Sequence, residues 1–194
     1  MGISLVFIIV AAVAAILLFL LLRTYNSLVG MRNAVRNGWS DIDVQLTRRH
    51  DLVPNLVESV RGYMAHERET LEAVTRARTQ AVTSSGAGVD LATRATAEMA
   101  LSGAVGNLFA VAERYPTLKA SQQFLLLQEQ LTSTENRIAY ARQYYNESVR
   151  RYNTALAEFP RNMLAGMMGF SPAALFAAEA EDKILPQIAA DERR

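Results

Sequence analysis

The sequence predicts an all-α protein with an N-terminal transmembrane helix followed by an antiparallel up-and-down four-helix bundle with long helices. Three observations lead to this fold class. Residues 3–22 are almost entirely apolar. Beyond them, apolar residues recur at steps of three and four over long stretches, which is the period of a helix that buries one face. The stretches that break this period are short and contain glycine or proline, which favours helices packed side by side.

The composition limits the classes of function. Hydrophobic residues make up 51% of the 194 residues, enough for a substantial core. The net charge of +1 argues against a nucleic-acid partner held by a strongly basic surface. The sequence contains no cysteine, which excludes a disulfide framework, thiolate catalysis and a cysteine-ligated zinc. His50 and His66 are the only histidines available for metal binding or acid-base chemistry.

The first predicted element is a membrane span, which with its flank occupies residues 1–23. At about 1.5 Å per residue, residues 3–22 extend over about 30 Å, the thickness of the hydrocarbon core of a bilayer. A cleaved signal peptide is the alternative, but no basic residue precedes the run and no small-residue cleavage site ends it. Arg23, Arg32 and Arg36 follow the span. The positive-inside rule therefore predicts a single pass, with the N-terminus outside and the rest in the cytoplasm.

The predicted bundle occupies residues 24–159. We expect its four helices at about 24–49, 52–82, 90–114 and 121–159. The first two are divided at Pro54, because a proline is tolerated in the first turn of a helix and breaks a helix interior. The chain then reverses at residues 48–51, with His50 or Asp51 capping the second helix. One continuous, kinked helix through Pro54 is the alternative.

The later helix boundaries have clearer signals. The glycine-containing loop at residues 83–90 separates the second and third helices, and Asp90 is the expected N-cap of the third. Pro116 ends the third helix. From Ile138 through Arg142 to Phe159, the residues on the stripe of the fourth helix alternate steps of four and three, a heptad pattern typical of left-handed packing.

The C-terminal segment, residues 160–194, follows the fourth helix, which is longer than the third. The fourth helix, at about 58 Å, is longer than the third, at about 39 Å, and so brings Phe159 back towards the bilayer. Residues 162–176 are apolar and methionine-rich. We expect them to dock on lipid or on a membrane partner, and packing beneath the bundle is the alternative. The residues expected to make that contact are Met163, Leu164, Met167, Met168, Phe170, Leu175 and Phe176.

Charged residues at core-facing positions predict an interhelical ion-pair network, because a charge buried alone is costly. The network comprises Arg32, Arg49, Glu67, Glu135 and Arg142, and its role is to fix the register of the helices. The alternative is that some of these side chains reach the surface. A second polar group is expected to form a partner-facing corner at the membrane-distal end of the bundle. It comprises Asp41, Asp43, Arg48 and His50.

No catalytic, cofactor-binding or metal-ligating residue is predicted, and no cofactor. The stretch HERET at residues 66–70 begins like the HExxH zinc motif, but Thr70 stands where the second histidine is needed. The sequence contains no phosphate-binding glycine loop. A metal-dependent hydrolase that uses His50, His66 and nearby acids stays as an alternative.

Four long stretches together resemble the LemA family. They are YNSLVGMRNAVRNGWSDIDVQLTRRHDLVPNLVESVRGYMAHE from Tyr25, LSGAVGNLFAVAERYPTLKA, QLTSTENRIAYARQYYNESVRRYN and FPRNMLAGMMGF. Gly38 stands where the family commonly has alanine. The resemblance implies a protein of the bacterial cytoplasmic membrane, with one N-terminal span, a cytoplasmic helical bundle and no established enzymatic activity. Similar proteins are often encoded beside a membrane metalloprotease, which implies an accessory role in membrane-protein quality control.

The favoured hypothesis is a membrane-anchored, non-enzymatic scaffold or adaptor. Its expected partners are membrane lipid, further copies of the chain and a membrane protein such as a membrane protease, with no nucleic acid. Self-association is suggested by the heptad pattern of the fourth helix and by Ala11 and Ala15, a small-xxx-small pair in the span. A protein that binds anionic lipid through Arg23, Arg32 and Arg36 is a further alternative.

Overall fold

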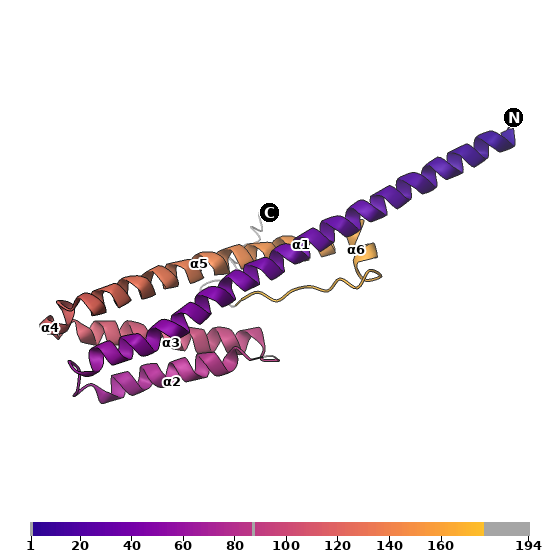
Figure 1. Cartoon of the computed structure of the whole chain (residues 1–194). Coiled ribbons are helices and arrows are strands. Elements are labelled where there is room, and N and C mark those ends of the chain that lie inside the picture. The colour runs from indigo at the N-terminus through magenta and orange to yellow at the C-terminus, as the bar shows by residue number, and fades with distance from the viewer. Residues whose placement is uncertain (1, 87, 177–194) are drawn as a thin grey trace, which may run out of the picture.

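The computed structural model describes residues 2–86 and 88–176, and every regular element in these ranges is a helix (Figure 1). The elements are α1 (Gly2–Arg61), α2 (Arg68–Ser84), α3 (Leu91–Ala112), α4 (Pro116–Lys119), α5 (Gln122–Ala157) and α6 (Arg161–Ala165). The all-α fold class is therefore confirmed. The last part of the predicted C-terminal segment, residues 177–194, lies outside the described residues.

One continuous helix, α1, contains the helix predicted at residues 24–49 and the first ten residues of the helix predicted at 52–82, whose remainder from Arg68 lies in α2. Helix α1 runs through Pro54, so the predicted reversal at residues 48–51 is wrong, and the chain reverses after Arg61 instead. Pro54 has no N–H to donate to the carbonyl of His50, one turn earlier. That carbonyl accepts a hydrogen bond from Nε of Arg78 on α2, at 2.9 Å. The helix can continue because the acceptor that the proline abandons is paired and the proline itself is exposed.

The start of α3 is fixed by a capping residue. The side chain of Asp90 accepts hydrogen bonds from the backbone N–H of Thr93 at 2.9 Å and from its hydroxyl at 2.5 Å. These hydrogen bonds lower the pKa of Asp90 below its ordinary value. Asp90 is thus the N-cap that its place before an apolar run predicts.

The longest helices, α1 and α5, lie side by side and antiparallel, and the α2–α3 hairpin packs against the part of this pair far from the N-terminus (Figure 1). Two apolar clusters result. The distal cluster draws on α1, α2, α3, α4 and α5, with Leu56, Val74, Leu108, Leu118 and Phe124 among its members. The proximal cluster is built mainly from α1, α5 and the C-terminal segment, with Leu28, Ile42, Val149, Tyr152 and Phe176 among its members.

The α1–α5 pair comes close together at Gly38. A Cβ atom added there would lie 3.2 Å from Cα of Tyr145 and 3.2 Å from Cδ1 of Tyr144. Glycine is a poor residue for a helix interior, but here its missing side chain lets the two backbones approach. The glycine that weakens the helix locally therefore improves its packing.

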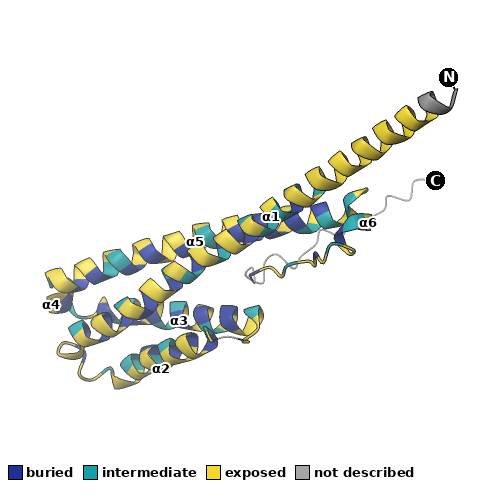
Figure 2. Ribbon diagram, turned by 45° about the vertical axis from the view of Figure 1, so that its right-hand side comes forward, coloured by how far each residue is buried: buried dark blue, intermediate teal, exposed yellow. Residues whose placement is uncertain are grey.

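The N-terminal part of α1 stands clear of the packed domain (Figure 2). Its apolar side chains from Val6 to Leu22 are exposed, including Phe7, Ile16 and Phe19. Within the described residues, α1 and α3 are long and apolar enough to cross a membrane. α3 contributes to the apolar core and buries Arg94 and Glu98, as a core helix of a globular domain does. The exposed apolar stretch of α1 thus indicates a membrane protein.

Candidate functional site

A buried charge cluster joins the helices at the boundary between the two apolar clusters. Arg49 of α1 and Glu98 of α3 are only 2% and 4% exposed, and the guanidinium Nη2 lies 2.5 Å from the carboxylate. Nη1 of Arg49 donates to the hydroxyl of Ser102 and to Glu135 of α5, both at 2.6 Å. Nε2 of His50 lies 3.0 Å from the other oxygen of Glu98. With Arg78 bound to the His50 carbonyl, the cluster connects α1, α2, α3 and α5.

The lowered pKa of Glu98 is consistent with a structural role, in which its carboxylate links α3 to α1. Burial alone would raise the pKa of this carboxyl, but the hydrogen bond with His50 and the charge of Arg49 outweigh it and hold the pKa below its ordinary 4.5. Glu98 is therefore ionised at neutral pH, and both of its oxygens are engaged. A cavity of about 20 Å³ adjoins the cluster, between Glu98, Arg142 and Phe176. That volume holds about one water molecule, whereas substrate pockets measure hundreds of Å³.

A second contact between α1 and α3 surrounds Trp39. The guanidinium of Arg94 lies 4.8 Å from the ring centroid of Trp39 and pairs with Asp43. Arg94 is buried, so its pairing with both a carboxylate and an aromatic face offsets the loss of hydration. Tyr145 meets the same indole edge-on at 5.7 Å between centroids. Trp39 thus lies where α1, α3 and α5 meet.

The predicted ion-pair network forms only in part. Arg49 and Glu135 pair as described above. Glu67 lies instead at the α1–α2 turn, where Arg114 and the hydroxyl of Tyr115 each donate to it at 3.0 Å. The hydrogen bond to Glu67 raises the pKa of Tyr115 above its ordinary value. The guanidinium groups of Arg32 and Arg142 lie over the rings of Phe170 and Phe176, at 4.9 and 5.6 Å from the centroids.

Glu98 and Arg94 were missing from the predicted network. Both precede the buried residues Leu101, Val105 and Leu108 of α3 at steps of three and four. Extending that stripe towards the N-terminus of the helix would have placed both charges in the interior.

The predicted partner-facing corner is wrong, because α1 does not reverse at these residues. Asp41 and Arg48 are exposed on the middle of α1. Asp43 pairs with Arg94, and His50 is buried against Glu98.

The two histidines do not come together. His66 is exposed in the turn between α1 and α2, more than a dozen residues beyond the buried His50. Within the described ranges, no group of three or more histidine, cysteine, aspartate or glutamate side chains is arranged to hold a metal ion.

The segment after α6 forms an extended strap in the groove between α1 and α5. We call residues 170–176 the strap; it runs from α6 towards the α2–α3 hairpin, along the part of the α1–α5 pair that the hairpin does not reach (Figures 1 and 2). Asn153 accepts from the N–H of Ala173 and donates to its carbonyl, both at 2.9 Å. Asn146 does the same for Phe176, at 3.0 and 3.1 Å. Two asparagines of α5 therefore clamp the strap backbone.

Two aromatic side chains anchor the ends of the strap. Phe170 and Phe176 are 7% and 3% exposed. The ring of Phe170 lies 5.7 Å from that of Tyr25, and the ring of Phe176 lies 5.8 Å from that of Trp39. Two of the residues expected to contact a membrane or partner thus face the domain's own groove.

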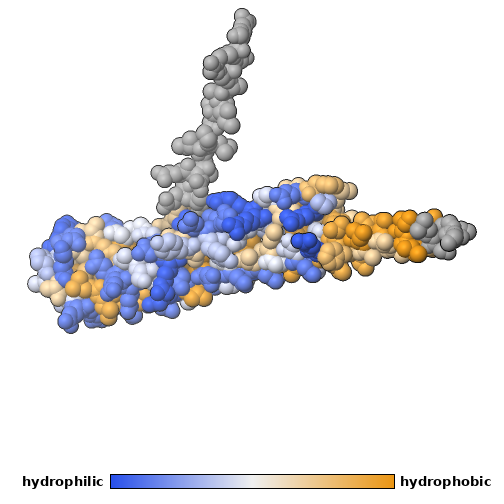
Figure 3. All heavy atoms as spheres, turned by 90° about the horizontal axis from the view of Figure 1, so that it is seen from above, coloured by the Kyte–Doolittle hydropathy of each residue, from blue (hydrophilic) through white to orange (hydrophobic). Residues whose placement is uncertain are grey.

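The other residues predicted to contact lipid or a partner differ in how exposed they are. Leu164 and Met168 are half-buried, while Met163, Met167 and Leu175 are exposed. With Phe159, which is 79% exposed, Met163 at 65% and Met167 at 86% form what we call the apolar rim. Figure 3 shows pale hydrophobic surface at the end of the domain next to the strongly hydrophobic part of α1.

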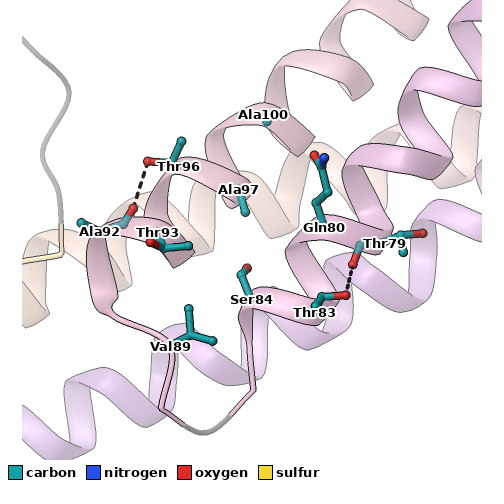
Figure 4. Close-up of a pocket in the computed structure, with 10 residues that line it drawn as sticks. All are labelled: Thr79, Gln80, Thr83, Ser84, Val89, Ala92, Thr93, Thr96, Ala97 and Ala100. Carbon is teal, nitrogen blue, oxygen red and sulfur yellow. Dashed lines mark hydrogen bonds between the residues drawn. The ribbon is translucent and has the colours of Figure 1, made fainter.

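A groove of about 730 Å³ lies between α2 and α3 near their connecting loop (Figure 4). Small residues line it, among them Thr79, Thr83, Ser84, Thr93 and Ala97. The hydroxyls of Thr83 and Thr96 donate hydrogen bonds to backbone carbonyls one turn earlier, which leaves them little capacity to bind a ligand.

Comparison with known proteins identifies relatives over most of the chain. The sequence is 29% identical over 190 residues to "Magnetosome protein MamQ 2" of Paramagnetospirillum magneticum, covering 86% of this chain and 69% of that protein. It is 28% identical over 172 residues to "Magnetosome protein MamQ" of Magnetospirillum gryphiswaldense, with 77% and 63% covered. It is 26% identical over 159 residues to "Protein LemA" of Metamycoplasma hominis, with 82% and 71% covered. The sequence model of the LemA family matches residues 38–189, so the chain belongs to the LemA family.

Proposed function

We propose that this protein is a membrane-anchored, non-enzymatic scaffold of the bacterial cytoplasmic membrane. α1 crosses the bilayer once, with its N-terminus outside and the packed domain in the cytoplasm. The domain presents a rigid helical surface to membrane proteins, among them a membrane protease in quality control. The observation that carries the proposal is that the exposed apolar stretch and the packed domain share the single helix α1.

The continuity of α1 favours a scaffold over a soluble domain on a flexible tether. No turn separates Leu22, the last residue of the apolar stretch, from Leu28, the first buried residue of the domain. A helix between these residues is stiff, because its backbone hydrogen bonds run along the axis. The domain is thus held at a set height above the bilayer, which suits a protein that positions partners.

The apolar rim supports contact with the membrane surface. Gly38 lies beside Tyr145, and the two helices are antiparallel. The end of α5, Ala157, therefore lies at about the level of residue 26 of α1, close to the end of the apolar stretch. Phe159, Met163 and Met167 follow directly. Exposed apolar side chains beside a membrane span favour insertion among lipid headgroups or contact with an intramembrane partner.

No observation on the described residues favours the two alternatives. The buried cluster has its groups engaged with one another and adjoins only a cavity of about 20 Å³. Of the three arginines considered for anionic lipid, Arg32 lies over the ring of Phe170, which leaves Arg23 and Arg36 exposed.

The absence of cysteine makes the topology directly testable. A Ser133→Cys variant places one thiol on the exposed face of α5. In intact cells, a membrane-impermeant maleimide should leave this thiol unlabelled, and permeabilisation should expose it. Labelling in intact cells would place the domain outside and sink the proposed orientation.

The rim is tested by spin labels on the full chain in nanodiscs. A label at Met167→Cys should collide with lipid-soluble oxygen more often than with a water-soluble relaxant. The matched label at Ser133→Cys, on the exposed face of α5, should show the reverse preference. Equal behaviour of the two labels would remove the membrane contact from the proposal.

A further inference from the structure

The groove between α1 and α5 is matched to its occupant in spacing as well as in chemistry. Asn146 and Asn153 are seven residues apart on a helix, which is about 10.5 Å. The residues that they clamp, Ala173 and Phe176, are three apart in an extended chain, which is about 10 Å. Each asparagine therefore meets the N–H and the carbonyl of one strap residue without distorting either partner.

The aromatic residues at the two ends of the strap also match their contacts on α1 in spacing. Tyr25 and Trp39 are fourteen residues apart on α1, about 21 Å along its axis. Phe170 and Phe176, which contact them, are six apart in an extended chain, about 20 Å. The groove thus recognises an extended segment with two phenylalanines at this spacing and reads its backbone between them.

The segment that joins the strap to α5 sets how far the strap can reach. The strap is joined to α5 by residues 158–169, which include the exposed Gly166 and Gly169, the latter with φ of 71°. They also include helix α6, and with α6 kept helical these twelve residues span up to about 30 Å. A close-packed neighbouring domain would place its own groove about two helix diameters away, about 20–25 Å. The strap of one chain is long enough to reach the groove of the next.

We propose that the strap exchanges between copies of this chain, so that residues 170–176 of one copy occupy the α1–α5 groove of a second copy. A neighbour's strap makes the same hydrogen bonds and aromatic contacts as the chain's own, so the contacts that exchange gives up are those of α6, whose Ala165 is buried in the proximal cluster. The proposal rests on the anchoring proposed above. Copies that share a membrane through α1 present strap and groove at the same height, which raises the effective concentration of one for the other.

The test uses two differently tagged full-length chains reconstituted together in liposomes. One carries Ala174→Cys in the strap, where only the backbone carbonyl is used, by the hydroxyl of Tyr145. The other carries Arg150→Cys, an exposed position one turn from each clamping asparagine on the same face of α5. A short bismaleimide should join chains of different tags. A chain with both substitutions should also give a cross-link within itself.

The matched variant adds Asn146→Ala and Asn153→Ala to the chain that carries Arg150→Cys. Losing both clamps should lower the cross-link between chains about tenfold or more. If that variant fails to fold, Phe170→Ala in the strap-donating chain must give the same loss with an intact groove.

Each other outcome overturns strap exchange. A cross-link within the doubly substituted chain but none between chains shows that the strap stays on its own domain. A cross-link between chains that survives loss of the clamps shows mere proximity. Absence of both shows that the strap leaves the groove in a membrane. Flotation of the same liposomes checks anchoring separately, so failure to float counts against the proposed function alone.

Discussion

Nε of Arg78 on α2 donates a hydrogen bond to the backbone carbonyl of His50 on α1, the acceptor that Pro54 leaves without its helical donor. A long-range side chain thus completes the backbone of a helix at its proline. The same bond ties the α2–α3 hairpin to the charge cluster, since the imidazole of His50 contacts Glu98 of α3.

Arg78→Ala should lower the free energy of unfolding by about 1–2 kcal/mol, because it leaves the carbonyl of His50 unsatisfied. Pro54→Ala restores the missing N–H donor. In the Pro54→Ala background, Arg78→Ala should therefore cost less than in the natural sequence. Chemical unfolding of the four proteins of this double-mutant cycle in detergent measures the coupling, and strictly additive effects would contradict it.

Glu98→Gln should destabilise the domain by about 1.5–3 kcal/mol at neutral pH, because the buried Arg49 loses one of its two carboxylate partners and keeps only Glu135. The pKa of Glu98 is lowered in the folded chain, so its contribution is present above its ordinary 4.5 and is lost as the pH falls through the folded value. The natural protein should therefore lose stability below about pH 4.5 more steeply than the variant. Parallel slopes of melting temperature against pH would count against this assignment.

Two glycines of α1 give opposite predictions for the same substitution. Gly38→Ala should destabilise by about 1 kcal/mol or more, because the new methyl group meets backbone of α5 at 3.2 Å. A methyl group added at Gly30 would have no neighbour within 4 Å, so Gly30→Ala should stabilise by about 0.5–1 kcal/mol through helix propensity. Thermal unfolding of the pair decides the matter, and equal shifts would show that the close approach at Gly38 is unimportant.

Phe176→Ala should loosen the strap and change the surroundings of Trp39, the only tryptophan in the sequence. Removing this buried ring should cost about 3 kcal/mol or more and shift the tryptophan emission to longer wavelength. Leu175→Ala, at a neighbouring position that is 47% exposed, is the control and should leave both nearly unchanged. An unshifted emission in Phe176→Ala would mean that the strap does not cover Trp39 in solution.

Helical class, the exposed apolar stretch and the N-cap Asp90 could all be predicted from the sequence, because each depends on residues close together along the chain. The continuation of α1 through Pro54 could not be predicted, because whether a proline ends a helix depends on a partner for the carbonyl that the proline leaves unpaired. That partner, Arg78, is more than twenty residues away in the sequence. Local signals favoured a break, and a tertiary contact overrides them.

The charge cluster and the strap could likewise be predicted only in part from the sequence. The positions of Arg49 and Glu135 on the apolar stripes of their helices predict that they face the core. To place Glu98 in the core, the buried face of α3 has to be known, and α3 is only weakly amphipathic. The strap has no periodicity to read, since its hydrogen bonds go to the side chains of Asn146 and Asn153. Its aromatic residues therefore resembled a free apolar surface.

Because α1 is one unbroken helix, a change in the tilt of its apolar part also moves the packed domain. Transmembrane helices tilt by about 20° on average, and the tilt responds to the mismatch between helix length and bilayer thickness. From Leu22 to Arg61 the helix measures about 58 Å. A change in tilt of about 20° would swing the turn after Arg61 sideways by about 20 Å. In the single-pass topology proposed above, thickening or thinning of the lipid around α1 would thus displace the far end of the domain sideways.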